Sequence, residues 1–371
     1  MNIPLMKKAD EYLGGMLCKL LGRSTQSAAE APSNPGNILF IKFWGMGSIV
    51  LTVPAVKAIR KQYPQAKLSY LTFDTNREAL EALGIADEII TISLSNPFKF
   101  NVDTIKLIKK LRKIKFDIVY DFEFFTYYSA LINRLIKPGY SVGFDNHKNR
   151  RSRLFTNTIE FNDHIHTRDN FLNLVSAGRS TGFFTEPLNI SPLNWESIKP
   201  YIVINPNASP LAFERRLPPE YFVKIIDSFC GENKFNIVLT GSAEEYNYVE
   251  KIYNRLMNKN NVVNTAGKLS ISELFALIAG CECLVTNGSG PLHIASAFNK
   301  PVIAFFGPES PVRYGPLSTK QLVFYRGLEC SPCMSVSNSK TVNCIFSEPK
   351  CMTGFDIDEI IIKIMDFINK T

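Results

Sequence analysis

Two apolar, strand-like runs joined by a glycine- and proline-containing turn constrain the fold of this chain more than any other feature. The runs are Cys283–Val285 and Pro301–Phe306, and between them the turn Gly288–Pro291 opens a short helix, Leu292–Phe298. Glycines at the end of a buried strand let backbone N–H groups point outward at a helix N-terminus. The corner therefore predicts a cradle for a phosphate or diphosphate. An ordinary strand–helix–strand corner without a ligand is the alternative.

The residues around this turn carry a longer pattern. From Asn287 the chain reads NGSGPLHIASAFNKPVIAFFGPESPVRYGP, which resembles the signature of glycosyltransferase family 9, the ADP-heptose:lipopolysaccharide heptosyltransferases. The positions in register are Gly290, Pro291, His293, Ala295, Ala297, Pro301, Val302, Ala304, Phe306, Gly307, Pro308, Pro311, Gly315 and Pro316. The resemblance extends from about Asn37 to the C-terminal helix. It implies an α/β fold of the GT-B type, with two Rossmann-like, doubly wound domains facing a cleft, and catalysis without a metal.

Size and charge are consistent with such a protein. A chain of 371 residues suits two domains, and 45% hydrophobic with 20% charged residues indicates a globular core. No apolar run has the length of a membrane span, and no signal peptide is evident. The net charge of +8 lies entirely within residues 1–200. It predicts a surface for an anionic partner such as a glycolipid, with a plain solvated basic face as the alternative. Nucleic acid is disfavoured, because no binding motif accompanies the charge.

The segment 1–36 is predicted to stand apart as an N-terminal amphipathic helix and linker. Met1–Arg23 combines apolar positions with lysines, and Ser24–Gly36 is rich in Ser, Ala, Pro and Asn. Basic amphipathic helices lie in membrane interfaces, although packing on the protein's own surface would leave the same pattern. Together with the resemblance, it leads us to expect a cytoplasmic protein, peripheral on the inner face of the cytoplasmic membrane.

Two strand–helix series follow, and they predict two doubly wound parallel sheets. We expect an acceptor-side domain over 37–190 and a nucleotide-sugar-binding domain over 200–355, with a linker at Pro187–Pro200. The expected strands are Ile38–Phe43, Leu68–Thr72, Glu88–Ile92, Phe116–Tyr120, Tyr201–Asn205, Asn236–Thr240 and Val262–Ala266, besides the two at the glycine turn. The final helix, 356–371, is amphipathic, and the resemblance implies that it crosses back to the first domain.

Residues for a nucleotide diphosphate gather in the second series. The segment Arg215–Pro218 reads R-R-L-P and resembles the family's K-R-W-P, which puts Arg215 in the place of a phosphate-binding lysine. An exposed charge cluster is the alternative for this arginine pair. Glu244, or its neighbour Glu245, follows a strand end and is placed to bond ribose hydroxyls. The full set expected at nucleotide and phosphate is Arg215, Ser209, Glu244, Gly288, Ser289, Gly290 and His293.

The catalytic residues are where the chain departs from the family. The family loop G-D-x-x-x-T-x-P carries the proposed base, and here Ser48 follows Gly47 in place of that aspartate. A serine cannot act as a base near neutral pH without another base beside it. The family's second aspartate is Gly288 here. After the strand Ile118–Tyr120 come Asp121 and Glu123; we place Gly47 and Asp121 on the acceptor side and name Glu123 as the replacement base.

Eight cysteines divide into two groups. Four are scattered, mostly among apolar residues, as expected of buried thiols in a reducing compartment. The other four, Cys330, Cys333, Cys344 and Cys351, form the pattern C-x2-C-x10-C-x6-C. This spacing suits a structural zinc, loop-closing disulfides or free thiols. No cofactor is required by the expected reaction.

The sequence therefore predicts an inverting, metal-independent transfer of a heptose-like sugar from a nucleotide sugar to a cell-envelope glycolipid or polysaccharide. One alternative is a catalytically impaired relative that binds a nucleotide sugar or a glycan, since both family aspartates are absent. A nicotinamide-dependent oxidoreductase is disfavoured, because Val50 occupies the place of the third glycine after Gly45 and Gly47.

Overall fold

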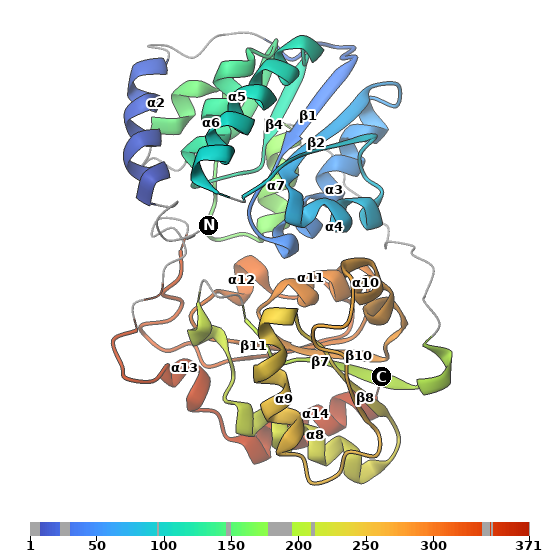
Figure 1. Ribbon diagram of the computed structural model, residues 1–371. Coiled ribbons are helices and arrows are strands. Elements are labelled where there is room, and N and C mark those ends of the chain that lie inside the picture. The colour runs from blue at the N-terminus through green and yellow to red at the C-terminus, as the bar shows by residue number, and fades with distance from the viewer. Residues whose placement is uncertain are drawn as a thin grey trace. The chain divides into compact units, whose positions relative to one another are not determined.

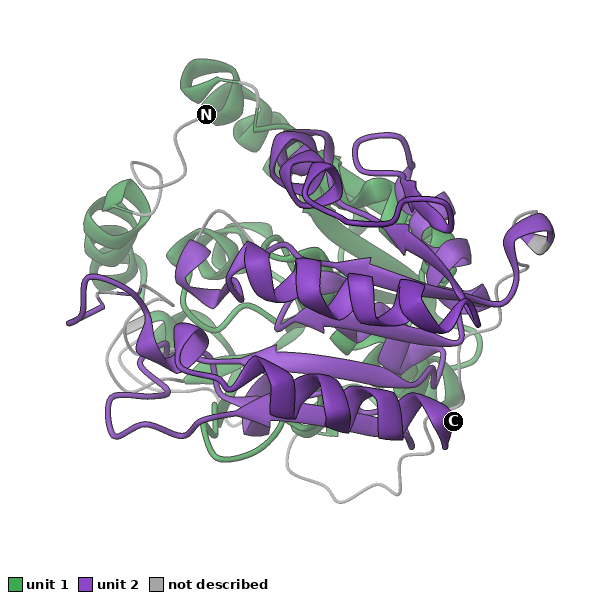
Figure 2. Ribbon diagram, turned by 90° about the horizontal axis from the view of Figure 1, so that it is seen from below, with its two compact units in different colours: residues 1–185 green, residues 186–371 purple. Residues whose placement is uncertain are grey.

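The computed structural model describes residues 8–22, 30–94, 96–145, 150–176, 195–208, 212–335, 342 and 344–370. The chain divides into two compact units, residues 1–185 and 186–371 (Figure 2). Each unit contains its own six-stranded parallel sheet, and each is described here by itself. The linker predicted at Pro187–Pro200 lies mostly outside the described residues.

Unit 1 is built on β1 to β6, with helices between consecutive strands (Figure 1). The strands are β1 Asn37–Ile41, β2 Lys67–Phe73, β3 Glu88–Ile92, β4 Ile118–Asp121, β5 Tyr140–Asp145 and β6 Asn157–Glu160. The helices are η1 Asp10–Gly14, α2 Gly15–Leu21, α3 Met46–Gln62, η2 Asp74–Asn76, α4 Arg77–Leu83, α5 Pro97–Ile114, α6 Tyr127–Ile136, η3 Arg150–Leu154 and α7 Thr167–Ser176.

Both faces of the unit 1 sheet are covered, which explains why β1 is apolar along its length. Leu39 and Ile41 belong to a core with Leu107 and Leu111 of α5. On the other face the Phe40 ring stacks on Phe122, which in turn meets a ring of α7. A strand buried on two faces cannot alternate apolar with polar side chains, so it appears in the sequence as a continuous apolar run.

The N-terminal helix belongs to unit 1. Cys18 is fully buried in a small core with Ala130 of α6 and with Leu154 and Phe155. The expectation of an amphipathic helix is met for residues 8–22, but the helix is packed against α6 instead of standing apart. Part of the predicted linker, 23–29, lies outside the described residues.

Unit 2 repeats the plan with β7 to β12. The strands are β7 Tyr201–Asn205, β8 Asn236–Leu239, β9 Val262–Asn264, β10 Cys283–Asn287, β11 Val302–Phe306 and β12 Gln321–Tyr325. The helices are η4 Glu196–Ile198, η5 Phe213–Arg215, α8 Pro219–Glu232, η6 Ala243–Glu245, α9 Tyr246–Asn254, α10 Ile271–Gly280, α11 Gly290–Ala297, α12 Pro311–Tyr314, α13 Lys350–Thr353 and α14 Ile357–Asn369.

The C-terminal helix α14 packs in unit 2. Its buried positions Ile357, Ile360, Ile364 and Ile368 belong to the core of that unit, together with residues of α8. The expected crossing back to the first domain stays a prediction. The amphipathic pattern of α14 correctly indicated one buried face, but the pattern holds no information about which domain covers that face.

Both sheets have the same strand order, which fixes where ligands bind. The orders are β3-β2-β1-β4-β5-β6 and β12-β11-β10-β7-β8-β9, so the direction of winding reverses between β1 and β4 and between β7 and β10. Ligands of open α/β sheets bind beyond the carboxyl ends of the strands at such a switch point. In unit 1 the paired strand ends are Ile41 and Asp121, and in unit 2 they are Asn205 and Thr286.

Candidate functional site

The glycine turn of unit 2 lies at its switch point, as the sequence predicted for an anion site. Strand β10 ends at Asn287, and α11 begins at Gly290 with Ser289 as its N-cap residue. The Ser289 hydroxyl lies 3.0 Å from the Thr286 hydroxyl, which orients the turn. Gly288, Ser289 and Gly290 are all partly exposed, so the N–H groups at the start of the helix are accessible to an anion.

Arg215 lies against this turn. Its Nη1 donates to the Gly288 carbonyl oxygen at 3.1 Å and forms an ion pair with Glu309 Oε2, also at 3.1 Å. The arginine side chain is 12% exposed, so its guanidinium is held in place but still reaches solvent. A held, partly exposed guanidinium beside a helix N-terminus is suited to a diphosphate.

A buried asparagine fastens the loop that carries Arg215. Asn287 Oδ1 accepts from the Leu217 backbone N–H at 3.1 Å, and its Nδ2 donates to the carbonyl oxygens of Pro206 and Asn207. One side chain thus joins the segments that follow β7 and β10 to the R-R-L-P segment. The loop after β7 continues to Ser209, which lies outside the described residues.

The remaining donor-side candidates lie in different surroundings. Glu244 is exposed on η6, whereas Glu245 accepts from the Ser242 backbone N–H as part of a capping box. Because the Glu245 side chain is already used in this capping box, Glu244 is the better candidate for hydrogen bonds to ribose hydroxyls. His293 is buried on α11 with Tyr314 beside it, and Arg216 lies over the ring of Tyr248 instead of facing the turn.

The structure gives a physical reason for the glycine at position 288. A Cβ added there would lie 2.9 Å from Cε1 of Phe306, a residue at the end of the neighbouring strand β11. No ordinary Cβ contact is that short, so the aspartate of the family could enter only if the Phe306 ring moved. Phe306 is itself in register with the family pattern, so an aspartate at position 288 would require this ring to lie differently.

In unit 1, Glu123 is locked in the interior. It is 0% exposed, and its Oε1 accepts from Lys42 Nζ at 3.0 Å and from the backbone N–H groups of Phe43 and Trp44 at 2.7 and 2.9 Å. Its Oε2 has no partner among the residues that the structure describes. The carboxylate fixes the loop after β1. Its role as the catalytic base stays a prediction, and this burial argues against it.

Asp121 is equally enclosed. Its Oδ2 lies 2.8 Å from Nη2 of Arg151, and both side chains are 0% exposed. Its Oδ1 accepts from the backbone N–H of Glu123. Burial raises the pKa of Asp121 to about 6, against the opposing effect of the Arg151 guanidinium. In this arrangement Asp121 braces the end of β4, so the expected contact with an acceptor stays a prediction.

Ser48 and Gly47 lie in the first turn of α3, directly after the loop that Glu123 holds. Gly45, which ends that loop, has φ of +83°, a backbone angle that favours glycine. Ser48 is half-buried and Gly47 is buried. The serine is thus presented at a helix N-terminus, where backbone N–H groups favour an anion.

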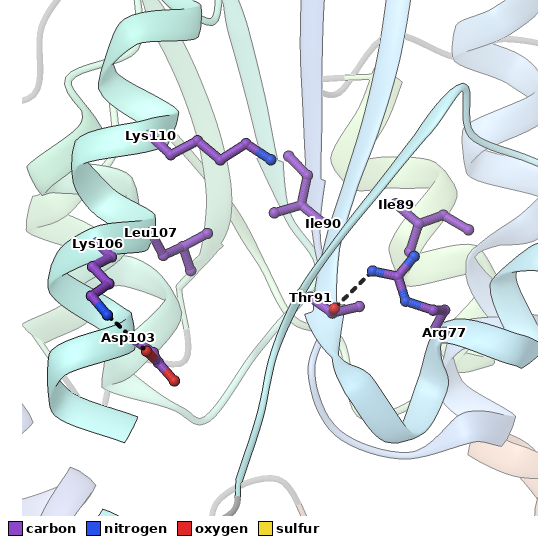
Figure 3. Close-up of a pocket in the computed structure, with 8 residues that line it drawn as sticks. All are labelled: Arg77, Ile89, Ile90, Thr91, Asp103, Lys106, Leu107 and Lys110. Atoms are coloured by element: carbon purple, nitrogen blue, oxygen red, sulfur yellow. Dashed lines mark hydrogen bonds and ion pairs between the residues drawn. The ribbon is translucent and has the colours of Figure 1, made fainter. Parts of the chain in front are cut away.

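A basic pocket of about 420 Å³ lies between α5 and the edge strand β3 in unit 1. Figure 3 shows Lys106 and Lys110 on the helix side and Arg77 on the other side of the strand. Arg77 donates to the Thr91 hydroxyl at 2.9 Å, and Lys106 lies 3.9 Å from Asp103. Arg77 also lies 3.6 Å from Glu81 and Lys110 lies 3.7 Å from Glu88, so each of the three cations has a carboxylate within ion-pair distance.

The four clustered cysteines line a second cavity, of about 180 Å³, together with Glu214 and Pro308. No disulfide joins the eight cysteines of the chain. Within the described ranges, no three His, Cys, Asp or Glu side chains are grouped so as to hold a metal ion, so the thiols as they lie do not fit the expected zinc. Burial raises the pKa of the Cys351 thiol to about 11.

The cysteine loop instead supports the donor site. The Met334 backbone N–H donates to the Pro308 carbonyl oxygen at 2.9 Å, and the Ser331 hydroxyl donates to the Gly307 carbonyl oxygen. These bonds hold the turn that presents Glu309 to Arg215.

Comparison with known proteins agrees with this geometry. The family model described as glycosyltransferase family 9 (heptosyltransferase) matches residues 104–342, which is more than half of the chain. The chain belongs to glycosyltransferase family 9. The resemblance to this family is thereby confirmed, and the expected pair of Rossmann-like domains agrees with solved structures of similar fold.

Relatives of this family 9 chain cover most of its length. It is 25% identical over 321 residues to lipooligosaccharide heptosyltransferase 2 of Campylobacter jejuni, covering 86% of this chain and 95% of the relative. In fold it resembles an E. coli ADP-heptose lipopolysaccharide heptosyltransferase II, with a TM-score of 0.72, 19% identity, and coverage of 90% and 99%. An E. coli heptosyltransferase with ADP gives 0.69, 15% identity, and coverage of 89% and 99%.

Four residues that organise these sites were not singled out from the sequence: Lys42, Arg151, Asn287 and Glu309. A charged residue directly after an apolar strand was the one available signal for Lys42, since it follows β1 without a break. Arg151 lies in a polar, basic stretch that resembles a surface loop. Its burial depends on Asp121, thirty residues earlier in the chain.

Among the described residues, no helix is both long enough and apolar enough to cross a membrane.

Proposed function

We propose that this family 9 glycosyltransferase transfers a heptose from ADP-heptose to an anionic glycolipid of the lipopolysaccharide or lipooligosaccharide core. The observation that carries the proposal is the placement of Arg215 against the Gly288–Gly290 turn at the switch point of unit 2. Held donors at that position stabilise the negative charge that develops on the departing nucleoside diphosphate. Loss of that leaving group needs no metal when donors and cations already neutralise it.

The choice of ADP as leaving group rests on the relatives. The E. coli enzyme of similar fold carries ADP-heptose in its name. In this chain the proposed contacts are Arg215, the turn and His293 for the diphosphate and Glu244 for the ribose. Ser209 is assigned with them on sequence grounds.

The acceptor is proposed to bind unit 1. The pocket of Arg77, Lys106 and Lys110 has a volume of about 420 Å³ and would offer an anionic core oligosaccharide three cations in exchange for their present carboxylate partners. The acceptor is a glycolipid, which we expect at the inner face of the cytoplasmic membrane. The excess charge of +8 in residues 1–200 supports such a partner.

Deprotonation of the acceptor hydroxyl needs a base, and because Glu123 is enclosed we assign that role to an anionic oxygen of the acceptor itself. Two residues of the chain contribute in other ways. Ser48, at the start of α3, would contact the acceptor as a hydrogen-bonding group. Glu123 was named from the sequence as the base; its enclosure with Lys42 supports a positioning role for the loop before Ser48.

A transfer assay tests the function. The protein is incubated with ADP-heptose and a core-truncated lipooligosaccharide, and a product heavier by one heptose is sought by mass spectrometry. UDP-glucose and GDP-mannose serve as donor controls. Heptose transfer that inverts the anomeric centre supports the proposal, and transfer from another donor only would overturn the donor assignment.

A second candidate function is binding without catalysis. Ser48 and Gly288 replace two carboxylates of the family, and Phe306 occupies the space near the second one. A protein that binds ADP-heptose in calorimetry but consumes none of it with any acceptor would be such a relative. The variant Ser48→Asp then provides the converse test, since it restores the family base.

A further inference from the structure

The N-terminal helix, residues 8–22, has one face that is firmly attached to unit 1. The carboxylate of Asp10 accepts from the backbone N–H groups of Tyr127 and Tyr128 at 2.9 and 2.8 Å. It thereby caps the N-terminus of α6 from 117 residues away. At the other end, Arg134 of α6 donates to the Leu21 carbonyl oxygen at 3.1 Å.

Close packing between these two ends fixes the orientation of the helix. Gly14 is buried, and a Cβ added to it would lie 2.6 Å from the Cβ of Tyr127. Cys18, one turn later, is fully buried. The helix therefore cannot rotate about its axis without losing these contacts, and the face that it presents to solvent is determined.

That outer face is apolar. Its large side chains and their exposed fractions are Tyr12 78%, Leu13 59%, Met16 52%, Leu17 39% and Leu20 73%. Five large apolar side chains exposed within nine successive positions form a continuous patch, which we call the apolar stripe. Such patches on otherwise polar surfaces mark interaction sites.

The charges beside the apolar stripe favour an anionic bilayer over a protein groove. Lys8 and Lys19 are exposed on the helix together with one acidic residue, Glu11, whereas Asp10 is withdrawn into the cap on α6. Arg134 and Arg153 lie at the C-terminal end, where Arg153 packs within 3.1 Å of the Cβ position of Gly22. An apolar face bordered by cations is the pattern of helices that lie in the plane of a membrane interface.

We propose that the apolar stripe inserts into the headgroup region of an anionic lipid bilayer and holds unit 1 at the membrane surface. This inference rests on the proposed function, because a glycolipid acceptor is presented at such a surface. It adds that the membrane contact is rigid, because the Asp10 cap fixes the N-terminal helix to α6. The occupant is the lipid surface itself, recognised by apolar insertion and by the neighbouring cations.

The test is co-sedimentation of the full chain with vesicles. We expect binding to phosphatidylglycerol-containing vesicles that weakens with salt, and little binding to phosphatidylcholine vesicles. The variant Tyr12→Ser/Met16→Ser/Leu20→Ser should bind anionic vesicles about tenfold or more weakly. The matched control is Met257→Ser/Val263→Ser/Ile362→Ser, which removes three exposed apolar side chains from unit 2 and should bind like the parent.

Two further measurements keep the outcomes separate. Heptose transfer to a deacylated, water-soluble acceptor should be equal in the parent and the stripe variant. A loss of this activity in the stripe variant would show that the substitutions disturb the fold, and a parent without this activity would count against the proposed function. Unchanged vesicle binding by the stripe variant would overturn the proposal. A parent that dimerises through the stripe in analytical ultracentrifugation and ignores vesicles would assign the face to a second copy and overturn it as well.

Discussion

The two switch points of this molecule share one topology and differ in what fills them. In unit 1 the charged groups beyond β1 and β4 are enclosed as two ion pairs, Lys42 with Glu123 and Asp121 with Arg151. In unit 2 the corresponding place holds a glycine turn, accessible backbone N–H groups and an arginine that reaches solvent. Arg215 is also paired, with Glu309, but it stays partly exposed beside accessible N–H groups, whereas both pairs of unit 1 are closed to solvent. The comparison supports the proposal that the donor binds unit 2 and that the enclosed pairs of unit 1 hold loops in place.

The largest expected effect concerns the buried ion pair of Lys42 and Glu123 in unit 1. Lys42→Met leaves the buried Glu123 carboxylate without its cation, so the free energy of unfolding should fall by about 3–5 kcal/mol. Urea denaturation measures it, with the exposed Lys113→Met as the control. A decrease of less than about 1 kcal/mol in the free energy of unfolding would mean that this ion pair does not hold the loop after β1 in place.

The variant Glu123→Gln distinguishes a catalytic base from a residue that only holds the loop after β1 in place. If Glu123 is the base, turnover should drop about 100-fold while stability and donor binding stay near the parent values. If it positions the loop, stability should fall along with turnover, because the buried Lys42 loses the Glu123 carboxylate. We expect the second result, read from urea denaturation and heptose transfer on the same preparation.

The donor site should respond in binding and not in folding. Arg215→Ala removes a charged hydrogen-bond donor from the diphosphate and should weaken ADP binding by about 1.5–3 kcal/mol, roughly ten- to hundredfold in Kd. Calorimetry measures the change, with the exposed Arg255→Ala in the same unit as control. Unchanged affinity with an intact fold would remove Arg215 from the site.

A smaller effect should appear at the cap of α6. Burial raises the pKa of Asp10 to about 6, above its value in the unfolded chain. The folded state thus binds the proton more tightly, so the stability from this group is present below about pH 4 and is lost as pH rises through about 6. Hydrogen exchange, corrected for intrinsic rates, should show residues 8–22 less protected at neutral pH.

Asp10→Asn provides the control for that titration. It keeps a side-chain oxygen for the cap but does not titrate, so the protection of residues 8–22 should become nearly independent of pH in this range. If parent and variant changed in parallel, another group would be responsible. Asp10→Ala should cost about 1 kcal/mol at low pH, as a lost cap does, and less at neutral pH.

The smallest effect concerns the thiols of unit 2. Cys330 and Cys344 are exposed and should react with a maleimide in the native protein, whereas Cys281 and Cys283 are fully buried and should react only after unfolding. A structural zinc would instead protect the loop thiols until a chelator is added. Metal analysis showing one zinc per chain, lost in Cys330→Ser, would support the zinc predicted from spacing.

The strands of both units could be predicted from the sequence because their signals are local. The bounds of β3 in unit 1 and β7 in unit 2 agree with the expected Glu88–Ile92 and Tyr201–Asn205. Two-face burial makes each strand a continuous apolar run, and proline or glycine marks the turns.

The accessibility of a side chain was beyond local signals. Glu123 follows the end of β4, which is the position expected of a catalytic carboxylate. Its burial is decided by Lys42, 81 residues earlier, which the pattern around Glu123 cannot reveal. The packing of α14 on α8 was beyond local signals for the same reason: periodicity gives the buried face of a helix and not the surface that covers it.

The cap that Asp10 places on α6 has a consequence for how the chain can be shortened. A designer who trims the sequence to its first Rossmann strand would remove a segment that looks dispensable. The trimmed protein would leave two amide groups at the start of α6 without their carboxylate and expose Ala130, Leu154 and Phe155 to water. Unsatisfied amides and a fresh apolar surface favour aggregation. The domain boundary that a fold diagram suggests is therefore not the boundary at which this chain can be cut.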